Sequence, residues 1–389
     1  MKKLLTILLA AVLCVMMAVA VNAADVYVTD GGEGDGTTAE TPMGSLEDAI
    51  ASIADEGGTV HIVNTYSHDG EFSEPEHAAP ITVTGGEFIF AGAKNRWYLN
   101  GETTFENITI TAADPSKGAV IVAQFNPIVM GEGVTVPEKT YLLGGHQLDG
   151  MGTDTAALMA DKGWPLDKDS YITVKSGVYH VVSGYSRGAS TAIYTGTSHL
   201  NIEGGTINML LGGSCNGSAG HNAEINIYGG EITTLMTAGD STRRLNGDCT
   251  VNIYGGSIAT LDICNIMGVG TVNISGGNVG QAAKRVTADA QYMVDGTVTL
   301  NILEGATVLP GVSMGFDVVN GEVSSPVINI PGITDETEEV AETTAPAAET
   351  TEAPAVTEEG GVNPVVIVVV VVAIIAVVAV VVVVAKKKK

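Results

Sequence analysis

One repeated phrase constrains this chain more than any other feature of its sequence. Between residues 200 and 305 a short pattern of alternating polar and apolar residues, ending in glycine, returns five times. The copies read LNIEGG, EINIYGG, TVNIYGG, TVNISGG and TLNILEG. Alternation with a period of two is typical of a strand that is buried on one face, and glycine gives the backbone freedom for a sharp bend. The phrase therefore predicts one strand and one turn, repeated along the chain.

Aligning the copies produces three columns of residues with different character. The polar column contains Thr82, Thr173, Asn201, Asn226, Asn252, Asn273 and Asn301. The apolar column, one residue later, contains Val83, Val174, Ile202, Ile227, Ile253, Ile274 and Ile302. The third column contains Thr84, Lys175, Glu203, Tyr228, Tyr254, Ser275 and Leu303. We expect the apolar column to face a core, and the two other columns to face outward.

The spacing of the copies predicts how the strands are arranged. From Gly177 onward the turn returns at intervals of 28, 25, 26, 21 and 28 residues, and a second short strand (TINML, EITTL, SIATL) follows it. A period of 20–30 residues with β-type units is typical of a solenoid, in which each coil pairs only with its neighbours. The expected fold class is all-β, a parallel β-helix over residues 25–332.

The beginning of this region resembles a known family. A strand at Val26–Val28, an acidic glycine-rich loop, a short helix and a second strand at 59–63 follow one another. The helix has a capping residue, Ser45, and an apolar stripe formed by Leu46, Ala49, Ile50 and Ile53, and Gly57-Gly58 ends it. This order resembles the start of secreted pectin-lyase-like right-handed parallel β-helix proteins of Gram-positive bacteria. The resemblance implies that the helix covers the open N-terminal end of the stack, and it brings no catalytic motif with it.

Both ends of the chain predict export and membrane attachment. Residues 1–24 have two lysines, an apolar run and small residues at the end, the pattern of a secretory signal peptide. Residues 365–385 contain only Val, Ile and Ala, and as a helix they would span about 31 Å, the thickness of a bilayer core. Residues 386–389 are lysines, which favour the cytoplasmic side. We expect a single-pass type I membrane protein at the cell membrane, with its ectodomain outside the cell.

The composition of the chain between the two terminal segments predicts a flexible stalk and argues against a nucleic-acid partner. Residues 333–364 are dominated by Thr, Pro, Ala and Glu, which indicates a disordered acidic stalk. The chain has 44 acidic and 18 basic residues, and six of the basic residues lie in the two terminal segments. So acidic a surface repels nucleic acid, and we expect no nucleic-acid partner.

One charged cluster is the candidate for catalysis. The segment AGDSTRRLNGDC contains Asp240, Arg243, Arg244 and Asp248. A basic residue beside carboxylates is what a polysaccharide lyase needs, and paired carboxylates are what a glycoside hydrolase needs. The alternative interpretation, which we favour, is a solvated charged turn between two strands.

A second cluster could hold a cation. Asp30, Glu33 and Asp35 lie in the loop TDGGEGDGTT, and Ca²⁺ prefers such oxygen ligands. Their spacing differs from that of an EF-hand, and acidic glycine-rich loops are common. The calcium site is therefore the less favoured interpretation, and we expect no other cofactor.

The outward columns offer a binding surface. Tyr228 and Tyr254 fall in one column on consecutive coils, beside Asn226 and Asn252. Stacked aromatic rings and amides could form a platform for sugar rings. The alternative is that both columns only stabilise neighbouring coils by like-on-like contacts.

Residues 139–170 interrupt the repeat, with one predicted helical turn around Thr155–Asp161. This excursion is either a decorative loop or a place where function sits. We predict a surface protein that binds glycans or a host or neighbouring cell surface without catalysis. The alternatives are a surface-tethered polysaccharide lyase or glycoside hydrolase, and a structural component of a surface layer.

Overall fold

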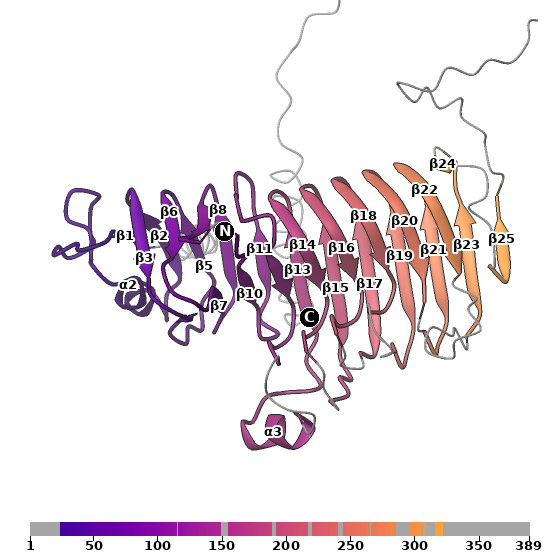
Figure 1. Ribbon diagram of the computed structural model, residues 1–389, viewed down its shortest axis with the longest axis horizontal. Helices are drawn as coiled ribbons and strands as arrows, with labels where there is room; N and C mark the ends of the chain where they lie inside the picture. The colour runs from indigo at the N-terminus through magenta and orange to yellow at the C-terminus, as the bar shows by residue number, and fades with distance from the viewer. Residues whose placement is uncertain are drawn as a thin grey trace, which may run out of the picture. The chain divides into compact units, whose positions relative to one another are not determined.

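The structure is a computed structural model that describes residues 24–114, 116–148, 155–188, 192–216, 220–239, 244–264, 266–284, 296–304, 306–308 and 316–321. These residues belong to the first of two compact units, residues 1–328. They form a parallel β-solenoid, in which strands of successive coils lie side by side along the stack (Figure 1). The predicted all-β parallel solenoid is confirmed.

The first sheet has twelve strands in sequence order. They are β1 (Ala24–Val28), β2 (Gly58–Ile62), β5 (Ile81–Thr84), β8 (Thr103–Glu106), β11 (Ile128–Met130), β13 (Ser170–Val174), β15 (Thr197–Ile202), β17 (Asn222–Ile227), β19 (Cys249–Ile253), β21 (Gly270–Ile274), β23 (Val298–Ile302) and β25 (Val318–Asn320). The repeated phrase forms the strands from β15 to β23 of this sheet.

The second sheet has ten strands and the third has three. The second contains β4 (Phe72–Ser73), β7 (Arg96–Tyr98), β10 (Val120–Val122), β12 (Tyr141–Leu143), β14 (Val178–Ser183), β16 (Thr206–Leu211), β18 (Glu231–Met236), β20 (Ser257–Ile263), β22 (Asn278–Lys284) and β24 (Thr307–Val308). The third contains β3 (Thr65–His68), β6 (Glu87–Phe90) and β9 (Thr109–Ala112). The repeat pattern predicts the first two sheets, whereas nothing in it predicts the third.

Strand register places the columns as expected. Asn226 pairs with Asn201 on one side and with Asn252 on the other, so the polar residues of successive coils lie in line. The apolar column next to them is buried, with Ile227 and Ile253 fully inside. Since a register shift of one residue would turn every side chain to the opposite face, burial of this column fixes the register of each coil.

Four of the five copies of the phrase end in a glycine pair, whose two members have different roles, as Gly255 and Gly256 show. A Cβ atom on Gly255 would overlap the carbonyl oxygen of Tyr228 on the preceding coil, so only glycine allows the coils to approach this closely. Gly256 has a φ of +76°, in the left-handed region that glycine adopts without strain. The pair therefore sets both the spacing of the coils and the direction of the turn.

The predicted helix near the N-terminus is confirmed as α2 (Leu46–Ser52). The Ser45 hydroxyl accepts a hydrogen bond from the backbone N–H of Asp48 at 3.0 Å, as the capping pattern predicts. The stripe formed by Leu46, Ala49, Ile50 and Ile53 is buried. The helix lies at the β1 end of the stack (Figure 1), where its apolar face joins the solenoid core.

The excursion contains the second helix, α3 (Thr155–Asp161), at the predicted position. The helix lies to one side of the strand stack (Figure 1). Met159 is fully buried in the solenoid core, and Trp164 and Leu166 pack partly against it. The excursion is therefore docked on the coils rather than free of them.

In the part of the chain that the structure describes, neither helix is long and apolar enough to cross a bilayer. The predicted membrane span at 365–385 lies outside those residues, as do the stalk at 333–364, the lysine tail at 386–389 and nearly all of the predicted signal peptide.

Candidate functional site

The tyrosine platform exists as a pair of stacked rings. Tyr228 and Tyr254 are 52% and 51% exposed, and their ring centroids lie 5.0 Å apart at an interplanar angle of 11°. Tyr171 and His199 stack in the same way on earlier coils, with centroids 4.7 Å apart. Such pairs stabilise adjacent strands, and each is worth about 0.5–1.5 kcal/mol beyond burial.

The asparagine column forms a continuous ladder of amide hydrogen bonds. Each side-chain N–H donates to the amide oxygen of the preceding coil, at distances from 2.7 to 3.1 Å. The ladder contains Asn201, Asn226, Asn252, Asn273, Asn301 and Asn320. Each inner asparagine uses one donor and one acceptor on its neighbours. These contacts favour the stabilising interpretation of Asn226 and Asn252 over a binding role.

The charged cluster is described only in part. Asp240 and Arg243 lie outside the described residues, whereas Arg244 and Asp248 lie within them. The Asp248 carboxylate accepts a hydrogen bond from the backbone N–H of Val269 at 2.7 Å, on the next coil. This contact makes Asp248 a bridge between coils, which is the charged-turn interpretation. The catalytic hypothesis for the cluster stays untested.

The acidic loop near the N-terminus holds itself together by hydrogen bonds. The Asp35 carboxylate accepts bonds from the backbone N–H and hydroxyl of Thr37 and from the hydroxyl of Thr41, which lower its pKa. Within the described ranges, no three or more His, Cys, Asp or Glu side chains gather as metal ligands, and Asp30, Glu33 and Asp35 are among the residues searched. The calcium site stays a prediction without a ligand cluster to support it.

A polar cleft of about 660 Å³ lies where the excursion meets the coils. We call it the amide cleft. Its lining comes from the segment between α2 and β2, from the turns between the second and first sheets on successive coils, and from the segment after α3. The lining residues are Asp55, Glu76, His77, Ala78, Asn100, Gln124, Asn126, His146, Lys162, Trp164, Pro165 and Lys168.

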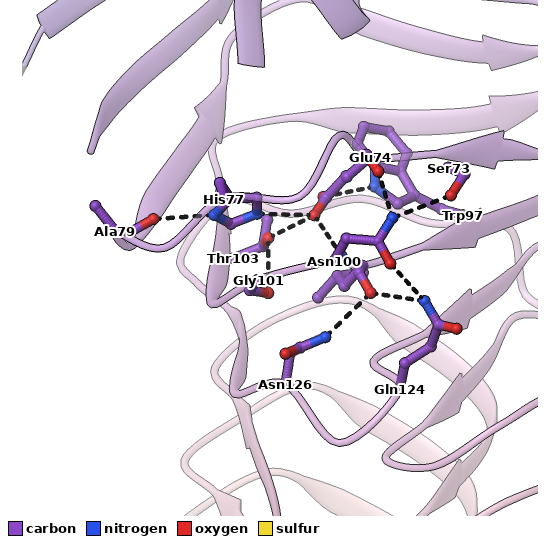
Figure 2. A network of polar contacts seen from close by, with 11 residues as sticks. Ser73, Glu74, His77, Ala79, Trp97, Asn100, Gly101, Thr103, Gln124 and Asn126 are labelled. Atoms are coloured by element: carbon purple, nitrogen blue, oxygen red, sulfur yellow. Dashed lines mark hydrogen bonds and ion pairs between the residues drawn. The ribbon is translucent and has the colours of Figure 1, made fainter. Parts of the chain in front are cut away.

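Three side-chain amides from two neighbouring coils form one wall of the cleft (Figure 2). Gln124 donates to the side-chain oxygen of Asn100 at 3.0 Å and to the carbonyl of Leu99 at 2.8 Å. Asn126 donates to the same Leu99 carbonyl at 3.1 Å. These bonds hold the amide nitrogens, which fixes where the amide oxygens of Gln124 and Asn126 stand as acceptors.

A buried ion pair holds this wall from behind. Glu74 accepts hydrogen bonds from Trp97 at 2.8 Å, from the Thr103 hydroxyl at 3.0 Å and from the backbone N–H of Asn100 at 3.3 Å (Figure 2). His77 donates to Glu74 at 3.1 Å and to the carbonyl of Ala79 at 2.9 Å. Burial opposes the charged form of His77, but these bonds outweigh it and raise the pKa of the imidazole.

Both nitrogens of His77 are therefore used by the protein. An imidazole in that state has no nitrogen left to act as a general base on a substrate. Although His77 lines the cleft, its role is to position Glu74, and through Glu74 the backbone of Asn100.

His146 is different, because it lines the cleft and its imidazole has no polar partner in the described part of the chain. The residue is 2% exposed, and among the described residues neither ring nitrogen has a hydrogen-bond partner. Its ring stacks on Trp164 at 4.2 Å and 15°, and meets the edge of Phe125 at 5.4 Å. Burial lowers the pKa of His146 to about 4, so at neutral pH the ring offers one N–H donor and one acceptor.

Backbone strain marks the same wall. Gln124 and Phe125 have φ angles of +53° and +65°, a region that residues other than glycine seldom adopt. Hydrogen bonds from their backbone N–H groups to Gly145 and Gly144 on the next coil hold them there. Such strain is of the order of 1–3 kcal/mol per residue and gathers at functional sites.

The chemistry of the cleft suits a polar, uncharged ligand. Its exposed charges are two carboxylates, Asp55 and Glu76, and two ammonium groups, Lys162 and Lys168. Lys162 lies 5.1 Å from the centre of the Trp164 ring. Fixed amides, a neutral imidazole and an indole face together provide donors and acceptors for hydroxyl groups and a flat surface for a ring.

The repeat pattern does not predict the residues of this cleft. Residues 139–170 interrupt the repeat, and His146 and Trp164 lie within that interruption. Asn100, Gln124 and Asn126 come from coils where the repeated phrase is absent, so no column drew attention to them.

No protein-family model, no curated protein and no solved structure matches this chain. The strand pairing described above establishes the parallel solenoid, and the likeness to pectin-lyase-like proteins stays a prediction from the N-terminal pattern.

Proposed function

We propose that the protein is a non-catalytic glycan-binding or adhesin-like surface protein that takes its ligand in the amide cleft. One observation carries the proposal: the buried imidazole of His146, which has no hydrogen-bond partner among the described residues and stacks on Trp164 at the wall of a polar cleft. A buried polar group without a partner costs about 1–3 kcal/mol, and a ligand that bonds to it removes this cost.

The ligand class follows from the groups around His146. A sugar hydroxyl both donates and accepts, which matches a neutral imidazole beside fixed amide oxygens. A sugar ring also has an apolar face that packs on an indole such as Trp164. The Tyr228 and Tyr254 pair is the less favoured surface, because the amides beside it are used in the ladder.

The test is binding of the full-length protein to an array of neutral glycans and mucins, followed by titration of the best ligand. We expect Trp164→Ala to weaken binding at least tenfold, because it removes the ring platform. Tyr254→Ala is the matched control, since it removes an aromatic side chain from the other candidate surface, and it should bind like the wild type. Unchanged binding by Trp164→Ala in a folded protein, or no glycan bound at all, would refute the proposal.

A surface-tethered lyase or hydrolase is the second candidate. The observation in its favour is that Asp55 and Glu76 line the same cleft as Lys162 and Lys168. Release of reducing ends or unsaturated products from a polysaccharide panel, lost in Glu76→Gln, would establish it. We expect no release, since both nitrogens of His77 are already hydrogen-bonded within the protein.

We also propose the topology that the terminal segments predict. Residues 1–24 direct export, residues 365–385 anchor the chain, and the solenoid stands outside the cell on the acidic stalk. The solenoid is proposed to wind right-handed, as parallel β-crossovers nearly always do. Protease treatment of intact cells should release the solenoid and leave a short membrane-bound fragment; protection of the solenoid would contradict this topology.

A further inference from the structure

The amide cleft runs along the stack of coils rather than within one coil. Its lining residues lie in segments that lead into five consecutive strands of the first sheet, which are β2, β5, β8, β11 and β13. In the same order, these residues are Asp55; Glu76, His77 and Ala78; Asn100; Gln124 and Asn126; and His146 with Lys162, Trp164, Pro165 and Lys168. Neighbouring strands lie about 4.8 Å apart, so the cleft is about 19 Å long.

Hydrogen bonds from one segment to the next keep the segments in line. The backbone N–H of Ala78 donates to the carbonyl of Ala54 at 3.0 Å. The backbone N–H of Asn100 donates to the Glu74 carboxylate at 3.3 Å, and the Gln124 side chain donates to that of Asn100 at 3.0 Å (Figure 2). The stacking of the coils therefore fixes the spacing of the polar groups along the cleft.

A ligand that matches this arrangement carries polar groups at a regular spacing of about one coil. A sugar unit in an extended glycan chain is about as long as the distance between two neighbouring coils, and its hydroxyl groups both donate and accept. The cleft volume of about 660 Å³ lies in the range of about 300–1,000 Å³ that encloses a ligand of several rings. A single sugar would fill only part of it.

An extended peptide is the alternative kind of polymer. A peptide gains affinity by adding its backbone to a free sheet edge and by placing side chains in pockets beside that edge. The amide cleft follows the segments between sheets instead of a strand edge. Among its lining residues only Ala78, Trp164 and Pro165 are apolar. The lining therefore favours hydroxyl groups over a peptide.

We infer that the cleft binds a linear neutral glycan lengthwise, with roughly one sugar unit per coil and about four units in all. The inference rests on the function proposed above, since it takes the ligand of the cleft to be a glycan. One end unit packs on Trp164 and bonds to His146, and the next units bond to the side-chain amides of Gln124 and Asn126. The unit at the other end meets Asp55, whose carboxylate accepts hydrogen bonds from hydroxyl groups.

The test is titration of the full-length protein with β-1,4-linked oligomers of glucose, mannose, xylose and N-acetylglucosamine, each from one to six units. In a series that binds, the affinity should rise at least about tenfold from the disaccharide to the tetrasaccharide, because each added unit brings further hydrogen bonds. It should stay nearly constant from the tetrasaccharide to the hexasaccharide. Equal affinity of the monosaccharide and the tetrasaccharide overturns the inference and leaves glycan binding itself in place. No binding in any of the four series also overturns it, whereas the glycan array decides the proposed function separately.

Variants at the two ends of the cleft test the lengthwise arrangement. Asp55→Ala should weaken binding of the tetrasaccharide about tenfold and leave that of the disaccharide unchanged, because only the longer ligand reaches this end. Glu56→Ala is the matched control, since it removes an exposed carboxylate one residue away that does not line the cleft, and it should bind both ligands like the wild type. Trp164→Ala should weaken binding of both ligands. An equal loss for both ligands in Asp55→Ala, or no loss for either, overturns the inference.

Discussion

At the scale of single residues, His146 holds two ring nitrogens inside the fold without a polar partner among the described residues. Its neighbours Trp164 and Phe125 are aromatic and hold the ring by stacking and edge contacts. Packing alone would be served equally well by an apolar ring. We therefore expect a substitution at His146 to change the stability of the fold and the binding of the ligand in opposite directions.

We predict that His146→Phe raises the free energy of unfolding by about 1–3 kcal/mol, because it removes two polar atoms that have no partner among the described residues and keeps the aromatic packing. The same variant should lose binding to the neutral glycan. Urea unfolding and titration of the glycan measure the two effects. A variant that is less stable and binds fully would show that His146 serves the fold alone.

The low pKa of His146 gives this residue a pH signature. Its pKa falls from 6.5 to about 4 on folding, so between these values the unfolded chain takes up a proton that the folded protein does not. Stability therefore decreases as the pH falls from about 6.5 to about 4, by about 3 kcal/mol. We expect urea midpoints of the wild type to fall more steeply over this window than those of His146→Phe. Parallel curves would contradict the burial of a neutral imidazole.

At the scale of elements, the turns and the strands of the solenoid are held by different means. The turn after β4 is held by the buried Glu74 and its four hydrogen-bond donors, one of them His77. The strands from β15 to β25 are joined by the asparagine ladder on their outward face. Both devices stabilise the stack, and only the first lies next to the amide cleft.

We predict that Glu74→Gln destabilises the protein by about 3–5 kcal/mol, because it leaves the His77 imidazolium buried without its counterion. Glu71→Gln is the matched control. The Glu71 side chain is 34% exposed and pairs with Arg96 at the surface. The loss of unfolding free energy in this variant should therefore stay below about 1 kcal/mol. Urea unfolding of both variants measures the difference. Similar losses would mean that the Glu74 pair is not a buried ion pair.

We predict that the loss of stability depends on how many hydrogen bonds of the asparagine ladder a substitution removes. Asn252→Ala removes two rungs, to Asn226 and from Asn273, and should cost about 1–3 kcal/mol. Asn320→Ala removes one rung, to Asn301, and should cost about half as much. Glycan binding should be unchanged in both variants. A loss of binding in Asn252→Ala with little loss of stability would restore the platform interpretation of this face.

At the scale of the solenoid, each coil pairs with its two neighbours, and stability is close to a sum over coils and their interfaces. The amide cleft uses segments up to residue 168, whereas the regular repeats follow it. Coils in the regular part should therefore be removable without harm to the binding site.

We predict that deletion of residues 224–249 yields a folded, shorter solenoid with unchanged glycan binding. Ala223 is aligned with Cys249 and Glu224 with Thr250, so this deletion removes one whole coil of 26 residues and keeps the register. Deletion of residues 224–248 is the control. It shifts the following strand by one residue and turns Val251 and Ile253 outward, so it should fail to fold. Circular dichroism and glycan titration compare the two deletion variants. If both fold and bind glycan equally well, the assignment of inward and outward columns is wrong.

The sequence alone determined the repeated strands, their inward and outward columns, the glycine turns, the capped helix α2 and the position of α3. Each of these depends on residues that lie close together in the chain, through alternation, capping and backbone freedom. The tertiary structure alone decided which side chains meet in the amide cleft. Its lining runs from Asp55 to Lys168, and these residues come together only because the coils stack in register.

The same holds for His146, whose burial depends on Trp164, a residue of the docked excursion. No local pattern states where an excursion will pack or which coil it will cover. A repeat can therefore be predicted from the local sequence pattern. A site that forms where the repeat is interrupted depends on tertiary packing, which no local pattern predicts.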